Sequence, residues 1–112
     1  MSSQISILTK MMESDIRKCD NYDISHHTAE NPARIPLMRD EIIYIHKIEI
    51  QASTNFWFEF HSASESRLLE YSLSALTDIS NDIVTRHKGS VYFSQSTPIS
   101  FVVYYVKLKI LQ

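Results

Sequence analysis

A chain of 112 residues is long enough for one domain that buries roughly two thirds of the surface exposed by the unfolded chain. Its single glycine excludes a phosphate-binding loop and a dinucleotide-binding fingerprint, because both need several glycines to bring the backbone close to a phosphate. The formal net charge of -2 supplies no general field for a nucleic-acid backbone, and the single cysteine excludes an intramolecular disulfide framework.

The location of the protein is predicted from what the sequence lacks. No apolar run reaches membrane-spanning length, and the first fifteen residues do not have the form of a secretory signal. An unpaired cysteine fits a reducing compartment. We therefore expect a cytoplasmic protein, or a protein of the host cytoplasm if the gene is viral or encodes an effector, with no membrane partner.

The first forty residues are expected to form a short helix and a loop. Apolar residues recur at helical spacing at Ile5, Leu8, Met12, Ile16 and Cys19. This spacing predicts an amphipathic helix from about Ser3 to Lys18, within a helical region 1–20. The alternative is an edge strand around Ile5. Residues 21–40 show neither helical nor strand periodicity, which indicates an irregular loop.

Two strands are predicted next, because the hydrophobic period drops to two. In residues 41–50 the even-numbered positions from Ile42 to Ile50 alternate with a second set that contains Lys47. In residues 55–62, Phe56, Phe58 and Phe60 alternate with Trp57, Glu59 and His61. A hairpin with a five-residue loop over 51–55 would pair Lys47 with Glu59 and place the three phenylalanines on one apolar face.

The clearest predicted helix runs from Ala63 to Lys88. Ser62 and Glu65 have the spacing of a capping box, and Gly89 stands where a C-terminal cap needs a left-handed residue. The apolar residues at helical spacing are Leu68, Leu69, Leu73, Leu76, Ile79 and Ile83. They predict a helix that lies with one face against an apolar surface.

A second hairpin is predicted after Gly89, with a turn near residues 95–98 and a long final strand. The order of elements is then strand, strand, helix, strand, strand. We predict a single α+β domain over 1–112 with two layers. The layers are a four-stranded antiparallel sheet and one long helix on one face, with a shorter N-terminal helix besides. The sheet and the long helix occupy residues 41–112.

The stretch DISHHTAENPARIP, residues 23–36, holds the densest set of reactive side chains. His26, His27 and Glu30 have ligand chemistry, but their spacing does not direct three ligands to one point, so no metal site is expected. The triplet of residues 26–28 has the His-x-Thr form that two-histidine phosphoesterases carry twice, and the second copy is absent. His26 and His27 are the catalytic candidates, and a solvated connection is the alternative.

One face of the predicted sheet is the candidate partner surface. If the long helix covers the side with Ile42, Phe58 and Val106, an apolar and aromatic set remains on the other side. Its members are Ile45, Trp57, His61, Phe101, Val103 and Tyr105. The N-terminal helix, a second copy of the chain or another protein could cover this side, and aromatic residues are typical interface anchors.

The sequence therefore predicts a non-catalytic protein-binding module, such as an adaptor, an inhibitor or a chaperone-like protein, homodimeric through the sheet face. One alternative is a small hydrolase or nuclease that uses His26 or His27. Another is single-stranded nucleic-acid binding, since FWFEF before a helix resembles the third strand of an RNA-recognition motif. The glycine and the basic residue of that motif are absent, so nucleic acid is not the expected partner. No cofactor is expected.

Overall fold

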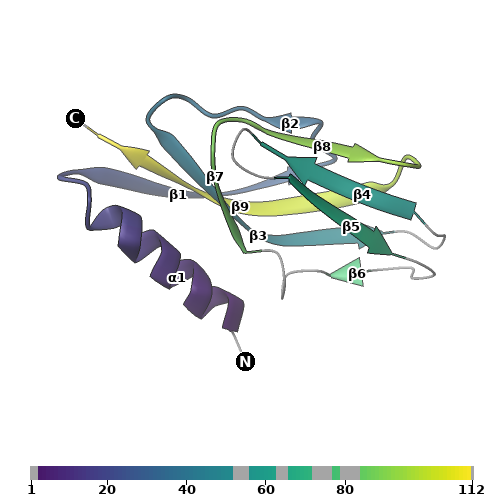
Figure 1. Ribbon diagram of the computed structural model, residues 1–112, viewed down its shortest axis with the longest axis horizontal. Helices are drawn as coiled ribbons and strands as arrows, with labels where there is room; N and C mark the ends of the chain where they lie inside the picture. The colour runs from purple at the N-terminus through teal and green to yellow at the C-terminus, as the bar shows by residue number, and fades with distance from the viewer. Residues whose placement is uncertain (1–2, 52–55, 63–65, 72–76, 79–83, 112) are drawn as a thin grey trace.

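The computed structural model describes residues 3–51, 56–62, 66–71, 77–78 and 84–111, which form one helix and nine strands. The helix is α1 (Ser3–Ile16). The strands are β1 (Tyr22–Glu30), β2 (Arg34–Ile35), β3 (Glu41–Gln51), β4 (Phe56–His61), β5 (Ser66–Tyr71), β6 (Thr77–Asp78), β7 (Thr85–Lys88), β8 (Val91–Gln95) and β9 (Ser100–Ile110). They make two facing sheets, with α1 beside one of them (Figure 1).

Both sheets are antiparallel and combine strands that are distant in the sequence. The first sheet has the order β1-β9-β3-β6, and β7 also pairs with β3. The second sheet has the order β2-β8-β4-β5. The chain changes sheet repeatedly, so consecutive strands such as β3 and β4 lie in opposite sheets. The result is a β-sandwich with a helix on its outside.

The main hydrophobic core lies between the two sheets. Its buried residues are Ile35, Ile43, Ile45, Ile48, Ile50, Phe56, Phe58, Phe60, Val91, Phe93, Phe101 and Val103. The Phe58 and Phe101 rings, from opposite sheets, meet edge to face with centroids 4.9 Å apart. Each large apolar side chain that is fully buried contributes about 1.5–3 kcal/mol, so this layer is what holds the sheets together.

A β-bulge in β3 explains how charged residues of that strand avoid the core. The pairing of β3 with β9 shifts register between Ile45 and Lys47, which leaves His46 as the extra residue. Strict alternation beyond Ile45 would turn Lys47 and Glu49 between the sheets. With the extra residue, Ile48 is turned inward instead and is fully buried.

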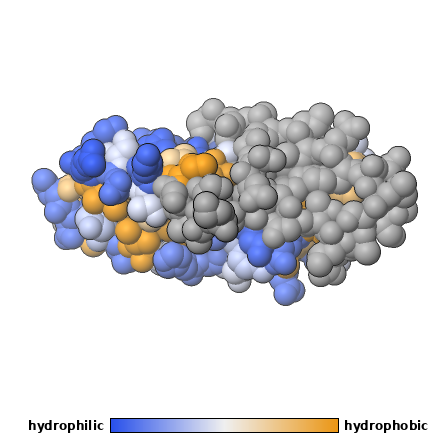
Figure 2. Space-filling model, turned by 90° about the horizontal axis from the view of Figure 1, so that it is seen from below, coloured by the Kyte–Doolittle hydropathy of each residue, from blue (hydrophilic) through white to orange (hydrophobic). Residues whose placement is uncertain are grey.

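Helix α1 covers part of the outer face of the first sheet, the face turned away from the second sheet. The residues that meet there are Leu8, Met11, Met12, Ile16, Ile24, Ile42, Tyr44, Val84, Val106, Leu108 and Ile110. Seen from below, the side on which α1 lies shows hydrophilic and hydrophobic groups next to each other (Figure 2). Within the described ranges, no helix combines the length and apolar character that crossing a membrane requires.

An ion pair between the buried Asp15 and the partly exposed Arg86 fastens α1 to the sheet. Arg86 donates to Asp15 twice, from Nε to Oδ2 at 2.7 Å and from Nη2 to Oδ1 at 3.0 Å, and the Tyr44 hydroxyl donates to Oδ2 as well. Burial alone would raise the pKa of Asp15, but the hydrogen bonds from Arg86 and Tyr44 outweigh it and lower that pKa. Burial and the nearby carboxylate raise the pKa of Tyr44. An ionised Asp15 and a neutral Tyr44 therefore hold the helix in place.

The predicted α+β fold with one long helix is wrong. β5 and β7 occupy parts of the segment from Ala63 to Lys88, with β6 between them, and residues 63–65, 72–76 and 79–83 lie outside the described residues. Gly89 has the expected positive φ of 87°, but it links β7 to β8 rather than ending a helix. β5 pairs with β4 over six residues, and this pairing overrides the local helical pattern.

Further predictions about the layout are corrected by the structure. Residues 21–40 are not an irregular loop, because β1 and β2 lie within them. Neither predicted hairpin forms, because β3 and β4 lie in opposite sheets, as do β8 and β9, so Lys47 does not pair with Glu59. The N-terminal helix ends at Ile16 rather than near Lys18. Periodicity indicates the faces of a strand, but it does not say which strand lies beside it.

Candidate functional site

The six residues predicted to bind a partner do not share one exposed sheet face. Ile45 and Val103 are fully buried between the sheets, and Phe101 is 3% exposed there. Tyr105 is half-buried and packs against the same core. The prediction of a single exposed face is wrong, because the chain supplies a second sheet that covers these residues itself.

The other two predicted residues, Trp57 and His61, lie on the outer face of the second sheet. There they belong to a group that we call the aromatic face: Arg34, Trp57, Glu59, His61, Tyr92 and Ser94. Trp57 is 39% exposed and Tyr92 is 43% exposed. These residues alternate with buried ones along β4 and β8, so their outward direction follows from the strand period of two.

Tyr92 is held between two neighbouring side chains. The Arg34 guanidinium lies 5.9 Å from the centroid of its ring. On the other side the His61 ring stacks against it, with centroids 5.9 Å apart and an angle of 23° between the planes. The register places the three residues in a row across β2, β8 and β4. A cation–π contact at an exposed site contributes about 0.5–1 kcal/mol, so these neighbours favour one position of the Tyr92 ring.

Trp57 is fixed through its backbone. Its N–H donates to Ser96 Oγ at 3.0 Å, and the N–H of Ser96 donates to the Trp57 carbonyl at 3.0 Å. Between Trp57 and His61 on the same strand, the Glu59 carboxylate accepts a long hydrogen bond of 3.5 Å from Ser94 Oγ. The exposed aromatic residues of this face therefore project from paired strands rather than from loops.

Sequence reasoning missed Arg34 and Tyr92 on this face. A signal for Tyr92 was present, because it alternates with Val91 and Phe93 just as Trp57 alternates with its neighbours. Arg34 lies in a segment predicted as loop, and a strand of two residues is too short to show a period. Only the pairing of β2 with β8 places Arg34 beside Tyr92.

The two catalytic candidates, His26 and His27, are both exposed on β1 and point to opposite faces of the first sheet. His27 stacks on Tyr105 with ring centroids 5.2 Å apart, and its Nε2 lies 3.0 Å from Ser25 Oγ. Burial, with a smaller effect of Glu41, raises the pKa of Tyr105. Because the two imidazoles diverge, they are not placed to act as acid and base on one bond.

His46, at the bulge, borders a polar part of the outer face of the first sheet. Burial, followed by the positive charges of His26 and Lys47, lowers the pKa of His46 and favours its neutral form. The Lys47 amino group lies 4.9 Å from the centroid of the Tyr104 ring, and the Tyr104 hydroxyl donates to Glu49. These polar contacts contrast with the apolar residues beneath α1.

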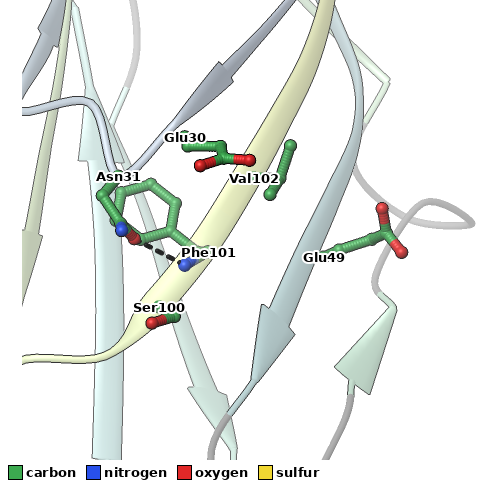
Figure 3. A pocket seen from close by; sticks show the side chains of 6 residues that line it. All are labelled: Glu30, Asn31, Glu49, Ser100, Phe101 and Val102. Carbon is green, nitrogen blue, oxygen red and sulfur yellow. Dashed lines mark hydrogen bonds between the residues drawn. The ribbon is translucent and has the colours of Figure 1, made fainter.

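A pocket of about 220 Å³ lies at the start of β9 and is lined by Glu30, Asn31, Glu49, Ser100, Phe101 and Val102 (Figure 3). The Phe101 N–H donates to Asn31 Oδ1 at 2.7 Å. The register places Glu30 and Glu49 on either side of Val102. Two strand spacings separate their Cα atoms by roughly 10 Å, so the carboxylates do not form a close pair.

His87 is fully buried between the sheets, in β7 rather than at the predicted helix end. Its Nδ1 lies 2.9 Å from Ser62 Oγ, and its Nε2 lies 3.0 Å from Thr85 Oγ1. Both ring nitrogens thus have hydroxyl partners, as a buried imidazole requires. In the part of the chain that the structure describes, no group of three or more His, Cys, Asp and Glu residues is placed to hold a metal ion.

Comparison with known proteins gives structural neighbours only. No protein-family model and no curated protein matches the chain. The chain is similar to the Tobacco streak virus coat protein dimer, at 10% identity and a TM-score of 0.42 over 83% of this chain and 87% of that chain. The chain is also similar to a VLP structure of the extra small virus of the giant freshwater prawn Macrobrachium rosenbergii. The identity is 9% and the TM-score is 0.39, over 82% of this chain and 81% of that chain. A second structure of the Tobacco streak virus coat protein is similar at 9% identity and a TM-score of 0.40, over 80% of this chain and 87% of that chain. Similarity at this level does not establish a shared fold or function.

Proposed function

We propose that the chain is a non-catalytic protein-binding module whose aromatic face contacts a protein partner. The observation that carries the proposal is the exposure of Trp57 and Tyr92, at 39% and 43%, on one sheet face. Tryptophan, tyrosine and arginine are the residues most enriched among those that dominate binding energy, because they combine a large contact area with a polar group. An adaptor, an inhibitor and a chaperone-like protein all need such a face.

The rigidity of the aromatic face supports this proposal. Binding immobilises interface side chains at a cost of about 0.5–1.5 kcal/mol each. Tyr92 is already held between Arg34 and His61, and the Trp57 backbone is bonded to Ser96. Less freedom is lost when a partner docks, so more of the contact energy remains as affinity.

Single-stranded nucleic acid is the second candidate partner, because Arg34, Tyr92 and Trp57 could stack on bases. The charge of the face favours protein instead. Glu59 places a carboxylate on the same strand as Trp57 and His61, and the chain has a formal net charge of -2. A phosphate backbone would meet one described cation and one acid on this face, whereas a protein partner can match both signs.

Photo-crosslinking from position 92 tests the proposal. Tyr92 is replaced by a photoreactive phenylalanine derivative, and the matched control carries the same group at Met38, which is 68% exposed in the connection between β2 and β3. Both proteins are irradiated in extract from the source cells. We expect a defined adduct with one polypeptide, or with a second copy of the chain, from position 92 and not from position 38.

The identified polypeptide is then titrated against the purified protein. Trp57 is the only tryptophan of the chain, so its fluorescence reports directly on the aromatic face. Trp57→Ser should weaken binding, measured by calorimetry, by about 30-fold, as expected for a central interface aromatic residue. Adducts with nucleic acid, equal adducts from both positions, or unchanged affinity of the Trp57→Ser variant would contradict the proposal.

A further inference from the structure

β1 forms a long free edge of the first sheet. It pairs with β9 along all nine of its residues without a register shift, and no strand among the described residues pairs with its other side. The remaining edges are shorter, since β2 and β6 have two residues each, β7 has four and β5 has six. β1 is therefore the longest regular edge that the described chain presents.

The hydrogen bonds at the ends of β1 identify its outward-facing backbone groups. The N–H of Asn31 donates to the Phe101 carbonyl at 2.8 Å, and the N–H of Leu111 donates to the Asn21 carbonyl at 3.0 Å. In an antiparallel pair, residues that bond to the partner strand alternate with residues that face away. Odd-numbered residues of β1 therefore bond to β9. The residues whose N–H and C=O face outward are Tyr22, Ile24, His26, Thr28 and Glu30.

β1 has few of the features that protect most sheet edges from pairing with another chain. Its acidic side chains, Asp23 and Glu30, lie near its two ends. Proteins protect edges with proline, lysine, bulges or very short strands. The sequence YDISHHTAE contains neither proline nor lysine, its pairing has no bulge, and most of its residues are exposed. Helix α1 lies on the outer face of the first sheet, mainly against β3, where Ile24 of β1 joins the same apolar cluster; it forms no strand pair with the backbone edge of β1.

We propose that a second copy of the chain pairs with β1, antiparallel and edge to edge, to form a dimer with one continuous sheet through both subunits. The outward-facing residues are symmetric about His26. A two-fold axis at His26 therefore places Tyr22 opposite Glu30 of the second copy and Ile24 opposite Thr28. All five residues gain partners, with about ten hydrogen bonds in total. A shift of two residues would leave an end residue unpaired.

The charged residues of two antiparallel copies of β1 are also compatible with each other. In this register Asp23 lies opposite Ala29 of the second copy, Glu30 lies opposite a tyrosine and His26 lies opposite His26, so no two acids face each other. Like charges in directly opposite positions would destabilise the pair. Ser25 lies opposite His27, and these two side chains already approach within 3.0 Å inside one chain. This self-complementarity favours a second copy over an unrelated strand.

The dimer contact and the aromatic face lie on different sheets. Each subunit of the dimer would keep its own aromatic face, so a partner with two binding sites would be held more tightly than by one subunit. The dimer does not depend on the proposed partner binding, and either can fail alone.

Proline substitution at an outward-facing position tests the dimer. Thr28→Pro removes an N–H that points away from β9, which a free edge tolerates, while Thr28→Val keeps it and serves as the control. Light scattering should give masses near twice 13.0 kDa for the wild type and Thr28→Val, and near 13.0 kDa for Thr28→Pro. A monomeric wild type, or a dimeric Thr28→Pro variant, would overturn the proposal.

Amide hydrogen exchange of the wild type gives a test that needs no variant. The N–H groups of Ile24, His26 and Thr28 should exchange at least about tenfold more slowly as the protein concentration rises through dimerisation. The N–H groups of Ser25 and His27, which bond to β9, should be protected at every concentration. A dimer in which the Ile24 and Thr28 amides stay unprotected forms through another surface, and the proposal is then wrong. The same conclusion follows if Trp57→Ser, but not Thr28→Pro, abolishes the dimer.

Discussion

The outer faces of the two sheets differ in how much of them is covered: a helix covers part of the first, whereas aromatic residues of the second are exposed. On the first sheet, α1 lies over Tyr44 and its aliphatic neighbours, and Asp15 ties the helix to Arg86. On the second sheet, Trp57 and Tyr92 stay 39% and 43% exposed. Both faces contain aromatic residues, so the aromatic content is not what separates them. The difference is that the neighbours are aliphatic on one face and polar on the other.

This comparison indicates which kind of sheet face a chain has to cover with another of its own elements. Each Å² of apolar surface left in water loses about 25 cal/mol of stabilisation, so a face of aliphatic residues favours an internal cover such as α1. A face that mixes aromatic rings with arginine, histidine and glutamate can remain in water and still bind a partner. The first face is therefore expected to contribute to stability, and the second to binding.

The largest expected effect comes from releasing the helix that covers the first face. Asp15→Asn removes the charge that accepts hydrogen bonds from Arg86 and Tyr44. It should lower the free energy of unfolding at neutral pH by about 1–3 kcal/mol, measured by urea denaturation. Glu13→Gln, an exposed position on the same helix, is the matched control and should change little.

The pH dependence of the Asp15→Asn effect has a defined sign. The folded protein holds the pKa of Asp15 below the ordinary value of 3.8, so its contribution is fully present above that value. It is lost as the pH falls through the lower, folded-state pKa. The difference in unfolding free energy between wild type and variant should therefore shrink on acidification below about pH 4. A difference that stayed constant in acid would contradict the role given to the ion pair.

A smaller effect is expected at the polar part of the first face. The folded state lowers the pKa of His46 below 6.5, so the unfolded chain binds a proton that the folded chain resists. Stability should be lost as the pH falls below the unfolded value and should be unaffected well above it. His46→Gln should therefore lose less stability than the wild type between about pH 7.5 and pH 5.5. Identical pH profiles of the two unfolding free energies would disprove this prediction.

The smallest effect on stability is expected on the second outer face. Replacement of both Trp57 and Tyr92 by serine removes exposed rings and opens no cavity in the core. The free energy of unfolding should fall by about 0.5–1 kcal/mol per site, the size of the cation–π contact that Tyr92 loses. Thermal unfolding followed by circular dichroism measures this change. A loss as large as that of Asp15→Asn would mean that this face contributes to stability as the first face does.

Several local features could be predicted from the sequence because their causes are local. The helical spacing from Leu8 to Ile16 predicted α1 to within a few residues of its end. The alternation in FWFEFH placed Phe58 inward and Trp57 outward. Gly89 was expected to need a positive φ, and it has one. Each of these depends on neighbours within a few positions of the chain.

Other features depend on residues far away in the chain and could not be predicted. Leu68 and Leu69 fit a helical stripe, yet their segment pairs with β4 as a strand. The His46 bulge reverses the alternation in β3 and so buries Ile48. The bulge is seen in the register of β3 against β9, not in the sequence of β3. Arg34 joins the aromatic face through the pairing of β2 with β8.

What the sequence by itself determined is the alternation of side chains along β4 and along the final strand, and the presence of one amphipathic helix near the start. Only the tertiary structure decided that two sheets face each other, that Ile45, Phe101 and Val103 lie between them, and that the rings of Trp57 and Tyr92 remain outside. The reason is physical. Alternation follows from backbone geometry over two residues, whereas strand pairing and burial depend on the free energy of contacts between segments that are distant along the chain.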